Sequence, residues 1–243
     1  MLSRTLEPEV MDQPADAADY DAMDHRAVNE RFVADLLAQV GAVGLLTGAE
    51  HSPAATSETP EWSPSAPTLD VIDLGTGTAR IPILLCQQVP PARVLAVDAA
   101  VSMLHIAIRN IEIAGLRERI QLSQGDCKDL AYPDAMFDVV MSNSIVHHLA
   151  QPERLLKEAL RLCRPDGTIF IRDLARPDTA TRVDELVALY AAGCNAHQTA
   201  LFRDSLHAAL TLDEVREIVS SLGQDPAGVQ LTSDRHWTWV GGK

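Results

Sequence analysis

Two glycines and three carboxylates form the strongest chemical pattern in the 243-residue sequence. In the segment VIDLGTGTAR, residues 71–80, an apolar run ends at Asp73 and is followed by Gly75 and Gly77. Small residues allow the backbone to approach a ligand closely, and the start of a helix presents free N–H groups to that ligand. The pattern predicts a strand, a tight ligand-binding turn and then a helix.

The residue after this turn argues against a dinucleotide. A G-x-G-x-x-G loop would place its third glycine at position 80, where this sequence has Arg80. The Asp73 carboxylate would also repel a pyrophosphate. A carboxylate at this point suits a ligand that carries a cation, such as the ammonium group of a methionine moiety. The segment therefore favours S-adenosylmethionine over NAD.

Two further acids follow the next expected strands. Asp98 ends the run VLAVD, where a carboxylate can accept hydrogen bonds from both ribose hydroxyls. Asp126, in LSQGDCKDL, can accept from an adenine amino group. Each has a plainer alternative, because Asp98 suits an N-cap of a helix over 99–113 and Asp126 suits a solvated loop. The expected cofactor contacts are Tyr20, Asp73, Gly75, Thr76, Gly77, Asp98, Ala99, Met103, Gly125, Asp126, Cys127, Asn143 and Ser144.

Alternating strands and helices are expected to position these residues. The apolar runs LDVIDL, RVLAVD, RIQLSQ, FDVVMS and TIFIRD alternate with helical patterns at about 79–89, 101–115 and 152–163. Such alternation requires crossover connections and predicts a parallel sheet covered on both faces. The final runs VQLTSD and HWTWVGGK predict an antiparallel hairpin. We therefore expect a doubly wound α/β fold with a seven-stranded, mostly parallel sheet and a helical lid.

Five motifs in order resemble those of class I S-adenosylmethionine-dependent methyltransferases. They are DLGTGTA, VDAAVSML, GDCKDL, FDVVMSNSIVHHL and LLKEALRLCRPDGTIFIRDL, and together they cover about residues 68–173. Ala79 replaces the third glycine of the first motif, which is a mild departure because alanine is also small. The resemblance implies a Rossmann-like fold, S-adenosylmethionine as cofactor and S-adenosylhomocysteine as product.

The chain is expected to divide into three parts. Residues 1–48 have a helical pattern and predict an N-terminal lid, and residues 49–67 contain four prolines and predict an exposed linker. Residues 68–243 predict the cofactor-binding domain, with a cap at about 178–212. The two lids are expected to choose the acceptor.

Methyl transfer requires an oriented acceptor and, for a hydroxyl or ammonium group, a base. His147, which follows the fourth expected strand, is the first candidate base, with His148 less favoured. The alternative is that one of the paired histidines only packs. Acceptor contacts are expected from His25, Asn29, Arg172, Asn195, His197 and Arg203. No metal is expected, since Ser142, Asn143 and Ser144 do not form a carboxylate cage.

The composition limits the classes of molecule that we expect as the methyl acceptor. With 20 Lys and Arg against 34 Asp and Glu, the formal net charge of −14 disfavours nucleic acids and anionic membranes. No signal peptide or long apolar span is visible, and the four cysteines are scattered, which favours a cytoplasmic location. We expect a small-molecule acceptor methylated on O, N or S. A non-catalytic S-adenosylmethionine-binding or scaffolding protein is the alternative, and a nicotinamide-dependent oxidoreductase is opposed by Arg80.

Overall fold

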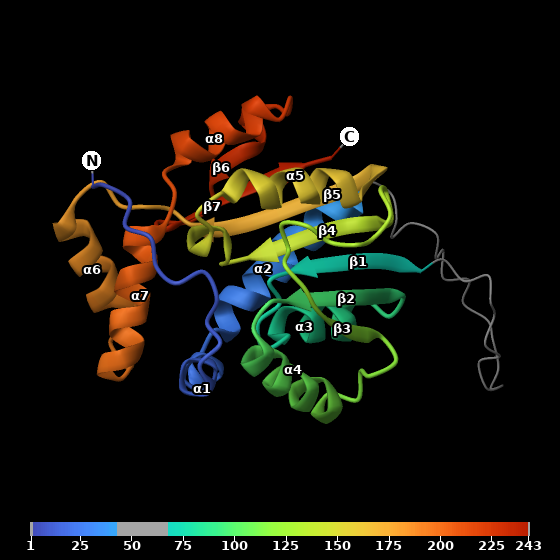
Figure 1. Ribbon diagram of the computed structural model, residues 1–243, viewed down its shortest axis with the longest axis horizontal. Helices are drawn as coiled ribbons and strands as arrows, with labels where there is room; N and C mark the ends of the chain where they lie inside the picture. Colours follow the sequence, from blue (N-terminus) through green and yellow to red (C-terminus); the bar gives the residue numbers. More distant parts are fainter. Residues whose placement is uncertain (1, 43–67, 243) are drawn as a thin grey trace, which may run out of the picture.

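A seven-stranded sheet forms the centre of the protein in the computed structural model, which describes residues 2–42 and 68–242 (Figure 1). The strand order is β3-β2-β1-β4-β5-β7-β6. Neighbours among β1 to β5 pair in parallel, whereas β7 pairs antiparallel with both β5 and β6. The expected mostly parallel sheet with a terminal hairpin is confirmed. The strands are β1 (Leu69–Leu74), β2 (Ala92–Asp98), β3 (Ile120–Gln124), β4 (Phe137–Asn143), β5 (Cys163–Leu174), β6 (Val229–Leu231) and β7 (His236–Gly241).

The strands are apolar throughout because helices bury both faces of the sheet. Successive side chains of a strand point to opposite faces, so Val71 packs in one core and Ile72 in the other. The first core lies under α2 (Arg26–Ala42), α3 (Arg80–Gln88) and α4 (Val101–Ile113). The second lies under α5 (Pro152–Leu162) and α8 (Leu212–Ser221). This two-layer covering is the doubly wound arrangement that the strand–helix alternation predicts.

Further helices lie beyond the carboxyl ends of the parallel strands. They are α1 (Pro14–Ala22), the short 3-10 helix η1 (Val146–His148), α6 (Ala180–Tyr190) and α7 (Ala196–Ala208), while η2 (Pro226–Gly228) precedes β6. Figure 1 shows α1 and the end of α7 on the side to which β1 and β4 point. The N-terminal lid expected over 1–48 contains two helices in its described part, and the linker expected over 49–67 lies outside the described residues.

None of the helices in the described ranges is long and apolar enough to cross a membrane.

Candidate functional site

The turn after β1 requires its glycines. Gly75 and Gly77 have φ angles of 78° and 55°, a region that glycine adopts without strain. The backbone N–H groups of Gly75 and Thr76 both donate to the carbonyl oxygen of Val97, at 2.9 and 2.8 Å. A Cβ atom on Gly75 would lie 2.5 Å from the Ile145 side chain. Hydrogen bonds therefore hold the turn against β2, and the Ile145 side chain packs on Gly75.

Two carboxylates lie on either side of this turn. Asp73 is 2% exposed, and burial raises its pKa to about 7, a shift that the Thr76 hydroxyl opposes and the Asp98 carboxylate increases. Asp98 accepts hydrogen bonds from the N–H groups of Gly77 and Ala100, at 2.7 and 2.8 Å, and burial raises its pKa too. No Lys or Arg of residues 2–42 or 68–242 forms an ion pair with either acid. A ligand cation near Asp73 would offset the free-energy cost of burying its negative charge.

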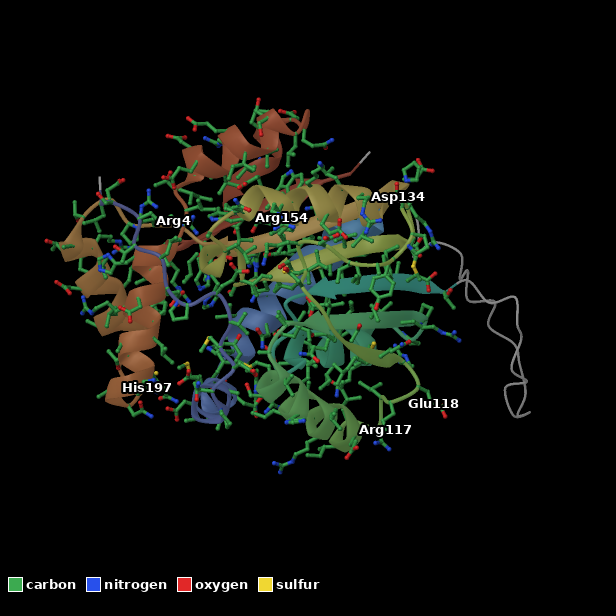
Figure 2. All side chains as sticks on the ribbon, viewed as in Figure 1. Arg4, Arg117, Glu118, Asp134, Arg154 and His197 are labelled. Carbon is green, nitrogen blue, oxygen red and sulfur yellow. The ribbon has the colours of Figure 1, made fainter. Side chains whose placement is uncertain are left out.

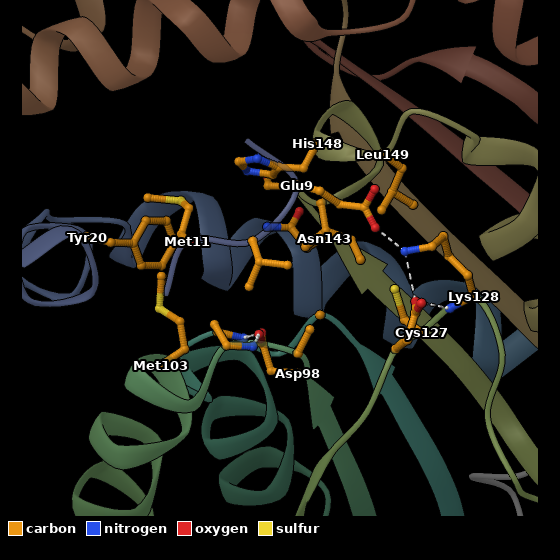
Figure 3. A pocket seen from close by; sticks show the side chains of 18 residues that line it. Glu9, Met11, Tyr20, Asp98, Met103, Cys127, Lys128, Asn143, His148 and Leu149 are labelled. Atoms are coloured by element: carbon orange, nitrogen blue, oxygen red, sulfur yellow. Dashed lines mark hydrogen bonds and ion pairs between the residues drawn. The ribbon is translucent and has the colours of Figure 1, made fainter. Parts of the chain in front are cut away.

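A cavity of about 200 Å³ opens beside Asp98 (Figure 3). Met103 and Cys127 contribute apolar walls, and the loop after β3 contributes Asp126. The cavity brings together most of the cofactor contacts expected from the sequence: Tyr20, Gly75, Gly77, Asp98, Ala99, Met103, Asp126, Cys127, Asn143 and Ser144. Gly125 does not line it, since its N–H bonds to the Asp98 carbonyl and a Cβ there would lie 3.0 Å from Leu130.

A second cavity of about 570 Å³ adjoins the first, and Tyr20, Gly75 and Asn143 line both. Asp73 and Thr76, the two other expected cofactor contacts, line only this second cavity. The side-chain oxygen of Asn143 is buried and has no hydrogen-bond partner in the part of the chain that the structure describes. An elongated ligand can therefore lie with one end at Asp98 and the other at Asp73.

His25 and Asn29, two of the expected acceptor contacts, also line the second cavity. The His25 ring lies 4.9 Å from the Tyr20 ring, centroid to centroid. Burial lowers the pKa of His25, although Asp24 and Asp21 oppose the shift. His25 therefore presents a neutral imidazole beside the point where the two cavities meet.

The structure does not place His147 in either cavity, contrary to its expected role as base. His147 is 3% exposed, and its Nδ1 lies 2.5 Å from Asp173 Oδ1. Its Nε2 lies 3.3 Å from Glu7 Oε1. Burial acts to lower the pKa of His147, but the charges of Asp173 and Glu7 outweigh it and the net shift is upward. The His147 imidazole thus faces two carboxylates and neither of the two cavities, and this geometry does not support His147 as the base.

His148, rather than His147, lines the first cavity. Burial and the neighbouring charge of His147 lower the pKa of His148 to about 3. Glu7, His147 and His148 bring one ligand atom each to within 4.8 Å of one another. The two imidazole planes are only 33° apart at a centroid distance of 4.3 Å, so their in-plane lone pairs do not converge on one ion. The cluster fits an ion pair better than a metal site.

Arg172, an expected acceptor contact, lies on the opposite face of β5 from Asp173. It is 4% exposed, and its guanidinium pairs with Asp35 at 2.7 Å and donates to Thr238 Oγ1 at 2.8 Å. It also lies against the Phe170 ring, 5.4 Å from the centroid. Because adjacent residues of a strand alternate between faces, Arg172 lines neither of the two cavities and instead lines a separate cavity with Asp35 and Thr238.

The expected contacts from the cap region also have other partners. Asn195 caps α7 by accepting from the Gln198 N–H at 2.9 Å. His197 Nδ1 lies 2.8 Å from Asp19 of α1, and Figure 2 shows His197 at the end of α7 that approaches α1. Arg203 pairs with Asp184 of α6 at 2.5 Å. None of the three lines either of the two cavities. Asn195 and Arg203 stabilise the cap itself, and His197 connects the cap to α1.

The N-terminal segment supplies cavity residues that the sequence did not indicate. Glu9, Val10 and Met11 line the first cavity, as do Lys128 and Leu149 (Figure 3). The segment LEPEVMD has no periodic pattern, so nothing in the sequence places it over the carboxyl edge of the sheet.

Comparisons with known proteins agree with this geometry. Residues 72–171 match the family model described as "Methyltransferase domain". The chain is 35% identical over 107 residues to a demethylmenaquinone methyltransferase of Lactobacillus johnsonii, covering 44% of each chain. It is 39% identical over 126 residues to a release factor glutamine methyltransferase of Rhodopirellula baltica, covering 49% of this chain and 42% of that one. The match thus spans less than half the length of these relatives.

A solved structure shares the fold. It is a SAM-dependent methyltransferase from Aquifex aeolicus, with a TM-score of 0.51, 17% identity and coverage of 71% of this chain and 81% of that chain. At this identity the likeness shows the fold alone. Together with the family match and the glycine turn between Asp73 and Asp98, it identifies residues 72–171 as part of a class I S-adenosylmethionine-dependent methyltransferase domain.

Proposed function

We propose that this protein transfers a methyl group from S-adenosylmethionine to a small-molecule acceptor. The observation that carries the proposal is the pair of adjoining cavities, with Asp98 in one, Asp73 in the other and the Gly75 turn between them. In this proposal the nucleoside of the cofactor binds near Asp98, and its methionine part binds near Asp73.

The first cavity is the proposed adenosine site. Asp98 keeps lone pairs for the two ribose hydroxyls while it accepts from Gly77 and Ala100, because each carboxylate oxygen accepts more than one hydrogen bond. Met103 and Cys127 then flank the adenine, and Asp126 lies at its polar edge. The use of Asp98 as a local acceptor for the start of α4 and its use as a ribose ligand are compatible.

The second cavity is the proposed site of the methionine moiety and the acceptor. Asp73 would face the ammonium group, and the Asn143 side-chain oxygen, which has no partner among the described residues, belongs to a side chain that lines both cavities. When bound, S-adenosylmethionine supplies a methyl group on a sulfonium, which is a good leaving group. The protein must then orient the acceptor, and orientation alone can contribute roughly 7–11 kcal/mol. We assign acceptor binding to His25, which directly precedes α2, and to Asn29, in the first turn of α2.

Two features support a small acceptor over a macromolecule. The N-terminal segment and α1 lie across the carboxyl edge of the sheet and line the two cavities, which limits the room for a large acceptor. The formal net charge of −14 opposes nucleic acids. The names of the relatives do not decide between acceptors, since one denotes a quinone precursor and another a protein glutamine.

A turnover experiment tests the proposal. The purified protein is incubated with methyl-labelled S-adenosylmethionine and a metabolite extract divided into fractions by size. Label is expected in a small-molecule fraction, with a matching amount of S-adenosylhomocysteine. Label confined to protein or nucleic acid would contradict the small acceptor. Cofactor binding without any turnover would favour the alternative, a non-catalytic S-adenosylmethionine-binding protein.

A further inference from the structure

Residues 2–12 form an extended segment, here called the strap, that crosses the first cavity. At one end the Arg4 guanidinium donates to the carbonyl oxygens of His147 and Leu149, at 3.0 and 2.9 Å. At the other end Asp12 accepts from the backbone N–H of Ser102, at the start of α4, at 3.0 Å. The strap is therefore tied to elements on two sides of the cavity.

The middle of the strap lies along the first cavity. Glu9 and Met11 line it, and Glu9 forms an ion pair with Lys128 of the loop after β3 (Figure 3). Lys128 also pairs with Asp126 at 2.9 Å. A ligand in the first cavity would thus lie between the strap and the ends of the strands.

A buried chain of charged groups fastens the strap at Glu7. The Glu7 side chain is 10% exposed, and its Oε1 lies 3.3 Å from His147 Nε2 and 3.4 Å from His148 Nδ1. On the far side of the His147 ring, Nδ1 lies 2.5 Å from Asp173, at the end of β5. Asp173 is held in turn by the backbone N–H of Val146, at 2.5 Å. The imidazole therefore connects a carboxylate of the strap to one fixed on the sheet.

We propose that the strap is a gate over the adenosine site and that Glu7 is its latch on His147. The inference rests on the proposed function, because it takes the first cavity as the site of adenosine. His147 is then a positioning residue, which explains why a histidine expected to act as a base is enclosed by carboxylates. Release of the latch controls how fast the cofactor enters and the product leaves.

The latch has a pH dependence of defined sign. The groups that face the pair from the neighbouring elements are Arg4 on the strap, His148 on η1, Asp173 on β5, and Asp204 and Ser205 on α7. Burial raises the pKa of Glu7, and the acids around His147 raise its pKa despite burial. The attraction needs an ionised Glu7 and a protonated His147. It therefore weakens as pH rises through the raised pKa of His147 or falls through the raised pKa of Glu7.

The first experiment measures exchange of S-adenosylhomocysteine by stopped-flow displacement in the wild type and in Glu7→Gln. Removal of the latch is expected to raise both the association and the dissociation rate constants, each by about tenfold, while Kd changes much less. Glu118→Gln is the matched control, because Glu118 is an exposed residue far from Arg4 (Figure 2). Glu7→Asp keeps the charge but shortens the side chain, and it is expected to exchange faster than the wild type.

A second readout follows the strap directly. Trypsin cleaves after Arg4 only when the guanidinium leaves its carbonyl partners, so cleavage there reports opening of the strap. S-adenosylhomocysteine is expected to slow this cleavage, and Glu7→Gln is expected to accelerate it. Wild-type exchange rates and wild-type cleavage in both Glu7 variants would overturn the gate. A wild type that binds no S-adenosylhomocysteine would contradict the proposed function instead, and the trypsin comparison without ligand would still test the latch.

Discussion

The turn after β1 and the lid formed by the strap, α1 and α7 differ in how their residues are positioned. Gly75, Asp73 and Asp98 are held by the backbone of adjacent parallel strands, through bonds such as that from the Gly75 N–H to Val97. The lid is held by side chains that meet across long sequence separations, such as His197 with Asp19 and Glu7 with His147. The first kind of site is fixed by the sheet, whereas the second depends on a few polar contacts that can open.

This difference predicts the largest effect for Gly75→Ala. The new Cβ would lie 2.5 Å from Ile145 at a φ of 78°, and backbone strain of this kind costs about 1–3 kcal/mol before any packing clash. We expect a clear fall in the melting temperature and loss of S-adenosylhomocysteine binding, measured by thermal shift and calorimetry. Gly193→Ala is the control, because nothing lies within 4 Å of the new Cβ there. Equal behaviour of the two variants would show that the turn is not the rigid part of the site.

Asp98→Ala is expected to act on binding more than on folding. Each charged hydrogen bond lost to a ribose hydroxyl costs about 1.5–3 kcal/mol of binding free energy. The melting temperature of the unliganded protein should change little, because Asp98 lies at a strand end and burial of its charge is unfavourable. Asp166→Ala, at an exposed position near the start of β5, is the control. Wild-type affinity in Asp98→Ala would remove this residue from the site.

Arg172→Met separates stability from binding. Arg172 is nearly buried, so the substitution removes its hydrogen bonds to Asp35 and Thr238 and costs about 1–3 kcal/mol of folding free energy, although Asp35 keeps its ion pair with Arg31 at 2.8 Å. Affinity for S-adenosylhomocysteine should stay unchanged, since Arg172 lines neither of the two cavities. A selective loss of affinity with unchanged stability would restore Arg172 as a site residue.

The pKa of Asp73, about 7, predicts a pH dependence of binding. In the unliganded protein the protonated form favours folding, and this contribution is lost as pH rises from the ordinary Asp range through about 7. A ligand ammonium binds the ionised form, so affinity for S-adenosylhomocysteine should rise with pH up to about 7, by up to roughly tenfold per unit. 5′-Methylthioadenosine lacks the ammonium group, and its calorimetric affinity should not follow this trend. The same pH profile for both ligands would contradict the role of Asp73.

Ala79→Gly is expected to have the smallest effect. Ala79 has a φ of 61°, in the left-handed region where alanine costs roughly 1–2 kcal/mol. Glycine relieves that strain but adds about 0.4–1 kcal/mol of unfolded-state entropy. The melting temperature should therefore rise slightly or stay constant. A marked fall would mean that the Ala79 methyl group contributes more to the core than its conformation costs.

The sequence predicted the sheet and most residues that line the proposed adenosine site, because both depend on local patterns. Gly75 directly follows β1, Asp98 ends β2 and Asp126 follows β3, so the end of each strand determines where these residues lie. His147, Arg172 and the cap residues were assigned less well, because a periodic pattern does not show which neighbour a polar side chain meets. The partners of His147 come from β5 and the strap, and the strap segment LEPEVMD has no pattern that predicts its position.

Calorimetry with S-adenosylhomocysteine, 5′-methylthioadenosine and NAD tests the central claim most directly. The two adjoining cavities predict that S-adenosylhomocysteine binds most tightly, since it can reach both Asp98 and Asp73. 5′-Methylthioadenosine should bind more weakly, and NAD should not bind, because Arg80 and Asp73 oppose a pyrophosphate at the Gly75 turn. Binding of NAD without binding of S-adenosylhomocysteine would contradict the account.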